Sequence, residues 1–231
     1  MLFRQFFDPV SSTYTYLLAS DYGREAIIID PVKEQVAQYL TAINQLDLRL
    51  VKAIDTHTHA DHVTALGSLR EQTGCLTLMG QFTRAECVSA HVADGDIIEA
   101  DGVKLQAIYT PGHTNESFSF LLTSAPEQAV FTGDVLLIRG SGRTDFQNGN
   151  AGDSYDSITQ KLFTLPDRTL VYPAHDYKGW TVSSIGEEKR FNPRLAGKSR
   201  EQYIAIMNNL NLPNPNMMDI AVPANLTCGM A

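Results

Sequence analysis

The sequence is poor in cysteine, in long apolar runs and in positive charge. Its three cysteines are odd in number and widely spaced, so they indicate neither a disulfide framework nor a CxxC motif. This usage is typical of a reducing compartment and predicts a cytoplasmic protein in which Cys75, Cys87 and Cys228 are buried packing residues. No apolar stretch approaches the roughly 18 residues of a membrane-spanning helix, and the first residues lack the apolar run of a secretory signal.

The charge balance excludes some classes of partner. Lysine and arginine number 18 against 26 aspartates and glutamates, which gives a formal net charge of −8. Nucleic acid and anionic membranes repel an acidic chain, so neither is expected as a partner. An anionic substrate would need a local group of cationic side chains. Hydrophobic residues make up 43% of the 231 residues, enough to bury a substantial core.

Apolar and β-branched runs alternate with a smaller number of helical patterns. Buried strands are predicted at Thr15–Ala19, Ala26–Ile29, Leu50–Ile54, Leu76–Met79, Lys104–Tyr109, Phe118–Leu122, Ala129–Thr132 and Leu170–Tyr172. Helices are predicted over Val36–Leu46, from after Asp61–His62 to about Gly74, over Tyr155–Phe163 and over about Glu201–Leu210. Many strands with few helices favour two sheets covered by helices, an α+β class. Residues 1–231 are expected to form one domain with a loop-rich C-terminal wrap from about residue 176.

Five of the six histidines directly follow predicted strands. The segment Asp55–His62 reads Asp-Thr-His-Thr-His-Ala-Asp-His and lies between a strand and a helix. Three further candidate ligands follow three other strands: His113, Asp134 and His175. Imidazole and carboxylate are the ligands that borderline divalent metals prefer. A lone histidine such as His91 is best explained as a surface residue, but five at matching positions indicate a metal site.

The order HxHxDH, then histidine, aspartate and histidine, resembles the metallo-β-lactamase superfamily. That resemblance implies an αββα sandwich of two mixed sheets flanked by helices. The segments GRTDFQ at 142–147, NLNLP at 209–213 and AVPAN at 221–225 are similar to the glutathione persulfide dioxygenases, or sulfur dioxygenases, in the branch that also contains glyoxalase II. This resemblance implies a homodimer that oxidises glutathione persulfide with dioxygen and water to glutathione and sulfite.

The number of metal ions decides the reaction. The resemblance assigns one iron(II) per chain, held by His57, His113 and Asp134. Two imidazoles and one carboxylate form the facial triad of non-haem iron oxygenases and leave three coordination positions open. The spare candidates are His59, Asp61, His62 and His175. They would orient the ligands or hydrogen-bond water on the metal, or they persist as a polar network from a two-metal ancestor.

Two other functions fit the same residues. In the first alternative all seven candidate ligands hold two metal ions, which activate a water that hydrolyses a glutathione thioester, as in glyoxalase II. In the second, the metal only stabilises a scaffold or interaction module. Seven clustered ligands at loop ends exceed what such a closed structural site requires.

Glutathione persulfide is an anion, so cationic side chains near the metal motifs are candidate substrate contacts. They are Arg143, Arg139 and Lys178. Arg143 is the best of them because its planar guanidinium matches a carboxylate, although an ion pair with Asp145 explains it equally well. Tyr177 is expected either to hydrogen-bond a bound oxygen species or to pack. Ser141 stands where some relatives have cysteine, which implies that this position is not essential to the iron chemistry.

Overall fold

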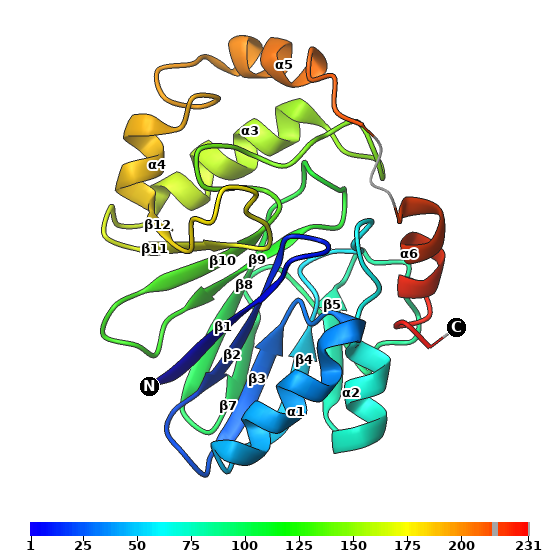
Figure 1. The fold of residues 1–231 in the computed structure, drawn as a ribbon. Helices are drawn as coiled ribbons and strands as arrows, with labels where there is room; N and C mark the ends of the chain where they lie inside the picture. Colours follow the sequence, from blue (N-terminus) through cyan, green and yellow to red (C-terminus); the bar gives the residue numbers. More distant parts are fainter. Residues whose placement is uncertain (214–216, 231) are drawn as a thin grey trace. The chain divides into compact units, whose positions relative to one another are not determined.

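The computed structural model describes residues 1–213 and 217–230 (Figure 1). The chain forms two compact units. Of the described residues, the first unit contains 1–92, 97–104 and 217–230, and the second contains 93–96 and 105–213. The chain therefore leaves the first unit and returns to it at its end. The assignment of residues 1–231 to one domain stays a prediction.

The sheet of the first unit has the strand order β1-β2-β3-β4-β5-β6. Its strands are β1 (Leu2–Asp8), β2 (Thr13–Ala19), β3 (Glu25–Ile29), β4 (Arg49–Ile54), β5 (Leu76–Gly80) and β6 (Ala90–Val92). The first three strands pair antiparallel, and β3 to β6 pair parallel. Because the parallel strands share one direction, the loops that follow them emerge at one edge of the sheet. A further strand, β7 (Ile97–Ala100), also belongs to this unit.

Helices cover this first sheet through their apolar faces. After the short 3₁₀ helix η1 (Lys33–Gln35), α1 (Val36–Gln45) buries Tyr39 and Ile43. Helix α2 (Leu66–Thr73) buries Leu66 and Leu69, and it ends at Gly74, whose φ of 73° is the left-handed conformation that favours glycine. Both helices pack in one core cluster with the inward side chains of β2, β3 and β4. The last helix, α6 (Met218–Asn225), also belongs to this unit.

The sheet of the second unit has the order β12-β11-β10-β9-β8. Its elements are β8 (Val103–Tyr109, residues 103–104 counted with the first unit), β9 (Phe118–Leu122), β10 (Ala129–Gly133), α3 (Ala151–Gln160), η2 (Leu162–Thr164), β11 (Leu170–Pro173), β12 (Ser183–Ser184), α4 (Ile185–Phe191) and α5 (Arg200–Asn208). Here β10 and β11 pair parallel, whereas β10 with β9, β9 with β8, and β11 with β12 pair antiparallel. Helices α3 and α5 pack with these strands in a core that includes Val130, Ile158 and Tyr203.

The eight predicted strands and four predicted helices are all present, and their boundaries differ by a few residues. The second helix begins at Leu66, so three residues of loop separate it from the HxHxDH motif. The third begins earlier than predicted, because the Asn150 side chain caps it by accepting from the amide of Asp153. The region after residue 176 contains α4 and α6 in addition to the predicted helix α5, and β1, β6, β7 and β12 were not predicted.

Cys87 and Cys228 form a disulfide across a sequence separation of 141 residues. The prediction that all three cysteines are packing residues is therefore wrong for this pair. It is confirmed for Cys75, which is buried and free. Sequence spacing could not reveal the bond, because its partners meet only once the C-terminal residues have returned to the first unit. No helix in the described ranges is long and apolar enough to cross a membrane.

Candidate metal centre

The first unit carries the HxHxDH motif in the metal loop, which we define as residues 55–64, between β4 and α2. The loop continues the parallel sheet for one residue, since the amide of Asp55 donates to the carbonyl of Leu78 at 3.2 Å. The imidazoles of His57 and His59 lie 4.2 Å apart between ring centroids, and those of His59 and His62 lie 4.3 Å apart. All three side chains are buried. The loop thus gathers its three histidines side by side.

Asp30, at the end of β3, holds the centre of this row. Its carboxylate accepts from the amide of Thr56 at 2.7 Å and from the hydroxyl of Thr56 at 3.0 Å. His59 Nε2 lies 3.1 Å from the same carboxylate. Burial alone would lower the pKa of His59, but the attraction and hydrogen bond of Asp30, with smaller contributions from Asp55 and Asp61, raise that pKa to about 9. Asp30 therefore favours the charged form of the fully buried His59.

The other two histidines of the motif are hydrogen-bonded through their Nδ1 atoms. His57 Nδ1 lies 2.9 Å from the hydroxyl of Thr56. His62 Nδ1 lies 2.9 Å from Asp61 Oδ2 and 3.3 Å from the hydroxyl of Thr13. This unit contains two groups of three potential ligands, and within each group the ligand atoms lie within 4.8 Å of one another. One group is His59, Asp61 and His62, and the other is His59, Asp30 and Asp55.

The second unit places His113 in the loop after β8. Gly112 has a φ of 145°, and a Cβ there would lie 2.3 Å from the Cα of Ser154, so the chain passes against α3 at a point where only glycine fits. His113 Nδ1 lies 2.7 Å from the carbonyl oxygen of Arg143, which can only accept, so Nδ1 carries the proton. Nε2 is then the nitrogen with a lone pair for a metal ion.

Asp134 connects the other two ligand candidates of this unit. Its Oδ1 lies 2.6 Å from His175 Nδ1, and its Oδ2 lies 3.6 Å from His113 Nε2. When two ligand atoms bind the same metal ion, each at about 2.1 Å, the two atoms lie roughly 3 to 3.5 Å apart. The Nε2 and Oδ2 atoms are close to that spacing, and an imidazole with a carboxylate is a donor set suited to a borderline divalent metal. These two residues therefore fit a shared metal ion.

The cationic candidates lie in the second unit and are already engaged to different degrees. Arg139 forms ion pairs with Glu187 and with the fully buried Glu188. Arg143 forms two bonds to Asp145, at 2.7 and 2.8 Å, and lies 4.0 Å above the ring of Phe146. It also donates to the carbonyl of Pro213 at 2.7 Å.

These bonds to Arg143 hold the pKa of the Asp145 carboxyl below its usual value. The ion-pair explanation of Arg143 is thus the arrangement seen in the structure, and its contact with substrate stays a prediction. Lys178 is exposed. The ring of Tyr177 is stacked on that of His175 at 6.0 Å, and the tyrosine is 71% exposed.

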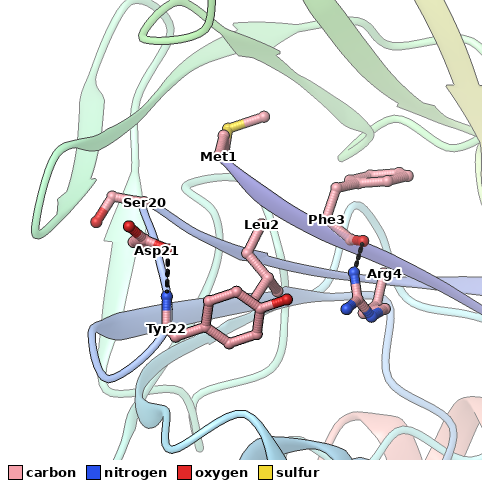
Figure 2. A pocket seen from close by; sticks show the side chains of 7 residues that line it. All are labelled: Met1, Leu2, Phe3, Arg4, Ser20, Asp21 and Tyr22. Atoms are coloured by element: carbon pink, nitrogen blue, oxygen red, sulfur yellow. Dashed lines mark hydrogen bonds between the residues drawn. The ribbon is translucent and has the colours of Figure 1, made fainter.

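Sequence reasoning missed residues that organise the metal loop. Asp30 follows a buried strand in Ile-Asp-Pro, the same strand-end position that identified the histidines, so the signal was present. Thr13 and Asn225 carried no such signal. The hydroxyl of Thr13 lies 3.1 Å from Asp61 Oδ2, and the Asn225 amide bonds the backbone of the metal loop. An open hollow lined by residues 1–4 and 20–22 lies at the β1 edge and contains no candidate ligand (Figure 2).

Comparison with known proteins adds the family to this geometry. The model of the metallo-beta-lactamase superfamily matches residues 8–88 and 89–175. The human protein named "Persulfide dioxygenase ETHE1, mitochondrial" is 48% identical over 231 residues, which cover 100% of this chain and 89% of the human protein. This chain belongs to the persulfide dioxygenase family. The bovine member of the family is 46% identical with the same coverage.

Solved structures agree with this assignment. The crystal structure of ETHE1 from Myxococcus xanthus matches with a TM-score of 0.95 and 56% identity, covering 99% of this chain and 100% of that one. A metallo-beta-lactamase from Staphylococcus aureus matches with a TM-score of 0.91 and 26% identity, covering 100% of this chain and 73% of that one. The predicted superfamily, the α+β class with two mixed sheets and the persulfide dioxygenase branch are therefore confirmed.

Proposed function

We propose that this persulfide dioxygenase family member oxidises glutathione persulfide at a single iron(II). Glutathione persulfide, dioxygen and water would give glutathione, sulfite and two protons, so the terminal sulfur gains three oxygen atoms and leaves the glutathione sulfur. The observation that carries the proposal is the family assignment over the full chain, which makes the protein an oxidoreductase. A homodimeric state and a cytoplasmic location are part of the same proposal.

His57, His113 and Asp134 would hold the iron. In support, His57 Nδ1 is hydrogen-bonded to the Thr56 hydroxyl and His113 Nδ1 to the Arg143 carbonyl, which leaves Nε2 of each ring available to a metal ion. When bound, iron(II) supplies the electron transfer that the spin-forbidden reaction of dioxygen with a closed-shell sulfur compound requires. Three ligands on one side leave room for both reactants.

The four remaining ligand candidates would orient the iron ligands instead of binding the iron. His175 would fix one oxygen of Asp134 at 2.6 Å, so that the other faces His113. His59, bonded to Asp30, would fix the backbone that carries His57. In this proposal His62 and Asp61 have the same orienting role, through their bond to each other.

The substrate would be held by cationic groups near these loops. We propose the guanidinium of Arg143 and the exposed ammonium of Lys178 as contacts for the glutathione carboxylates. Arg139 is the weakest candidate, because it is already paired with two carboxylates. Tyr177 would hydrogen-bond an oxygen of the reacting species through its exposed hydroxyl.

The test is metal content together with oxygen uptake. Protein purified without oxygen should contain about one iron per chain, and an oxygen electrode should record uptake with glutathione persulfide. His57→Ala should lose both the iron and the uptake, whereas His91→Ala, an exposed histidine on β6, should keep both. Undiminished uptake by the His57 variant would refute the ligand assignment.

One observation keeps the hydrolase alternative testable. Ligand atoms of His59, Asp61 and His62 lie within 4.8 Å of one another, close enough to hold an ion of their own. If the purified protein contained about two metal ions per chain and hydrolysed S-lactoylglutathione rapidly, the two-metal thioester hydrolase would replace the dioxygenase proposal.

A further inference from the structure

The C-terminal segment AVPAN ends in an asparagine whose side chain lies against the metal loop. Asn225 is the last residue of α6, which is drawn in red in Figure 1, and it is 2% exposed. Its Nδ2 donates to the carbonyl of His59 and to the carbonyl of His62, both at 2.9 Å. Its Oδ1 accepts from the amide of Thr64 at 2.8 Å. One amide side chain thus satisfies three backbone groups within six residues of the loop.

The residues that follow hold this side chain in place. We call residues 225–230 the C-terminal clasp. The carbonyl of Cys228 accepts from the amide of Gly67 at 2.9 Å, at the start of α2. A Cβ on Gly229 would lie 2.2 Å from the carbonyl oxygen of Thr64, so the two backbones are in close contact. The disulfide from Cys228 to Cys87 fixes the clasp covalently.

The metal loop has little regular structure to hold it without these bonds. Between the end of β4 and the start of α2, the described backbone contacts other backbone at a few isolated points, among them the bond from Asp55 to Leu78 and the bridge of Thr64 with Val32. Buried carbonyl and amide groups require partners. The Asn225 side chain is the partner of three such groups, the carbonyls of His59 and His62 and the amide of Thr64.

From these contacts we propose that Asn225 is a positioning residue for the metal site. It acts through the backbone of the metal loop, whose conformation sets where His57 presents its ligand nitrogen. The inference rests on the proposed function, because it takes His57 as an iron ligand. Groups that hydrogen-bond metal ligands directly contribute roughly 10- to 100-fold to metal affinity, and Asn225 acts one step further away, so we expect an effect at the lower end of that range.

Asn225→Asp is the sharpest variant, because it keeps the size and the Oδ1 acceptor but turns the donor Nδ2 into an oxygen facing two carbonyls. Asn44→Asp is the matched control, the same chemical change at an exposed position of α1. Apparent iron(II) affinity is measured without oxygen by chelator competition. The electron paramagnetic resonance spectrum of the iron(II) protein treated with nitric oxide reports the ligand geometry directly. Hydrogen exchange of peptides over residues 55–64 reports the loop backbone.

Asn225→Asp should lose roughly 10-fold or more in iron(II) affinity, change the nitric oxide spectrum, and exchange faster in the metal loop than in the rest of the first unit. Asn225→Ser, which introduces no charge, should show the same changes in smaller size. Wild-type affinity and spectrum in both variants would overturn the proposal. So would loss of protection across the whole first unit, or failure of both variants to fold, since either shows a general structural role. If wild-type protein itself bound no iron through His57, the proposed function would fail instead.

Discussion

Opening the Cys87–Cys228 disulfide should destabilise the protein strongly, because it closes a long loop. The bonded residues are 141 positions apart. In the chain-entropy description a loop of that length loses roughly 17 cal/mol/K in the unfolded state, about 5 kcal/mol at 25 °C. Native disulfides usually contribute roughly 2 to 5 kcal/mol when measured. We therefore expect the free energy of unfolding to fall by about 2 to 5 kcal/mol on reduction.

Equilibrium unfolding in urea, with and without a phosphine reductant, measures this difference. Thiol titration in denaturant should find one free thiol before reduction, that of Cys75, and three afterwards. Cys87→Ser should be as unstable as the reduced protein and should not respond to reductant. Cys75→Ala should retain the full response, since this cysteine is outside the disulfide.

Two results would refute the reasoning. Three free thiols in the unreduced, denatured protein would mean that the bond does not form. One free thiol together with an unfolding midpoint that reductant leaves unchanged would mean that the bond forms but does not constrain the unfolded chain.

Three further predictions concern single side chains. The buried Tyr39 hydroxyl has its pKa raised from 10.0 to about 12 by burial, so its stabilisation is present below pH 10 and lost as pH rises from 10 to 12. Between pH 10 and 12 the free energy of unfolding, measured in urea, should therefore fall by about 3 kcal/mol less in Tyr39→Phe than in the wild-type protein. The same fall in both proteins would contradict this prediction. Glu188→Ala should cost roughly 3 to 5 kcal/mol of unfolding free energy in urea, because it leaves Arg139 without its buried partner, and a cost under about 1 kcal/mol would be inconsistent. Gly112→Ala should lower the melting temperature far more than Gly74→Ala, because a Cβ at position 112 would collide with the backbone of Ser154 and one at position 74 would contact nothing. Equal decreases in melting temperature would contradict this explanation.

Much of the fold could be predicted because apolar runs report burial. The runs at β2, β3, β9 and β10 are buried along almost their whole length, so continuous hydrophobicity identified them. Strand β1 was not predicted, because Leu2–Asp8 is mostly half-buried or exposed and mixes arginine and glutamine with phenylalanine. Helix α6 was not predicted, because Pro223 lies inside it and a proline usually indicates that a segment is not helical.

The candidate site was predictable where ligands follow strands and unpredictable where partners are distant. Strand ends placed all seven ligand candidates, because a loop at a sheet edge is the simplest route to convergent side chains. What Arg139 and Asn225 do could not be predicted, because their partners lie 49 and more than 160 residues away. Such contacts depend on how the chain returns to itself, and local residue patterns carry no information about that.

The separation of 163 residues between His62 and Asn225 also has a consequence for biosynthesis. A ribosome adding about 5 to 20 residues per second makes the histidines of the loop roughly 10 to 30 s before the asparagine that fixes their backbone. A nascent chain therefore displays the histidines of the loop for that interval before their backbone is held by Asn225.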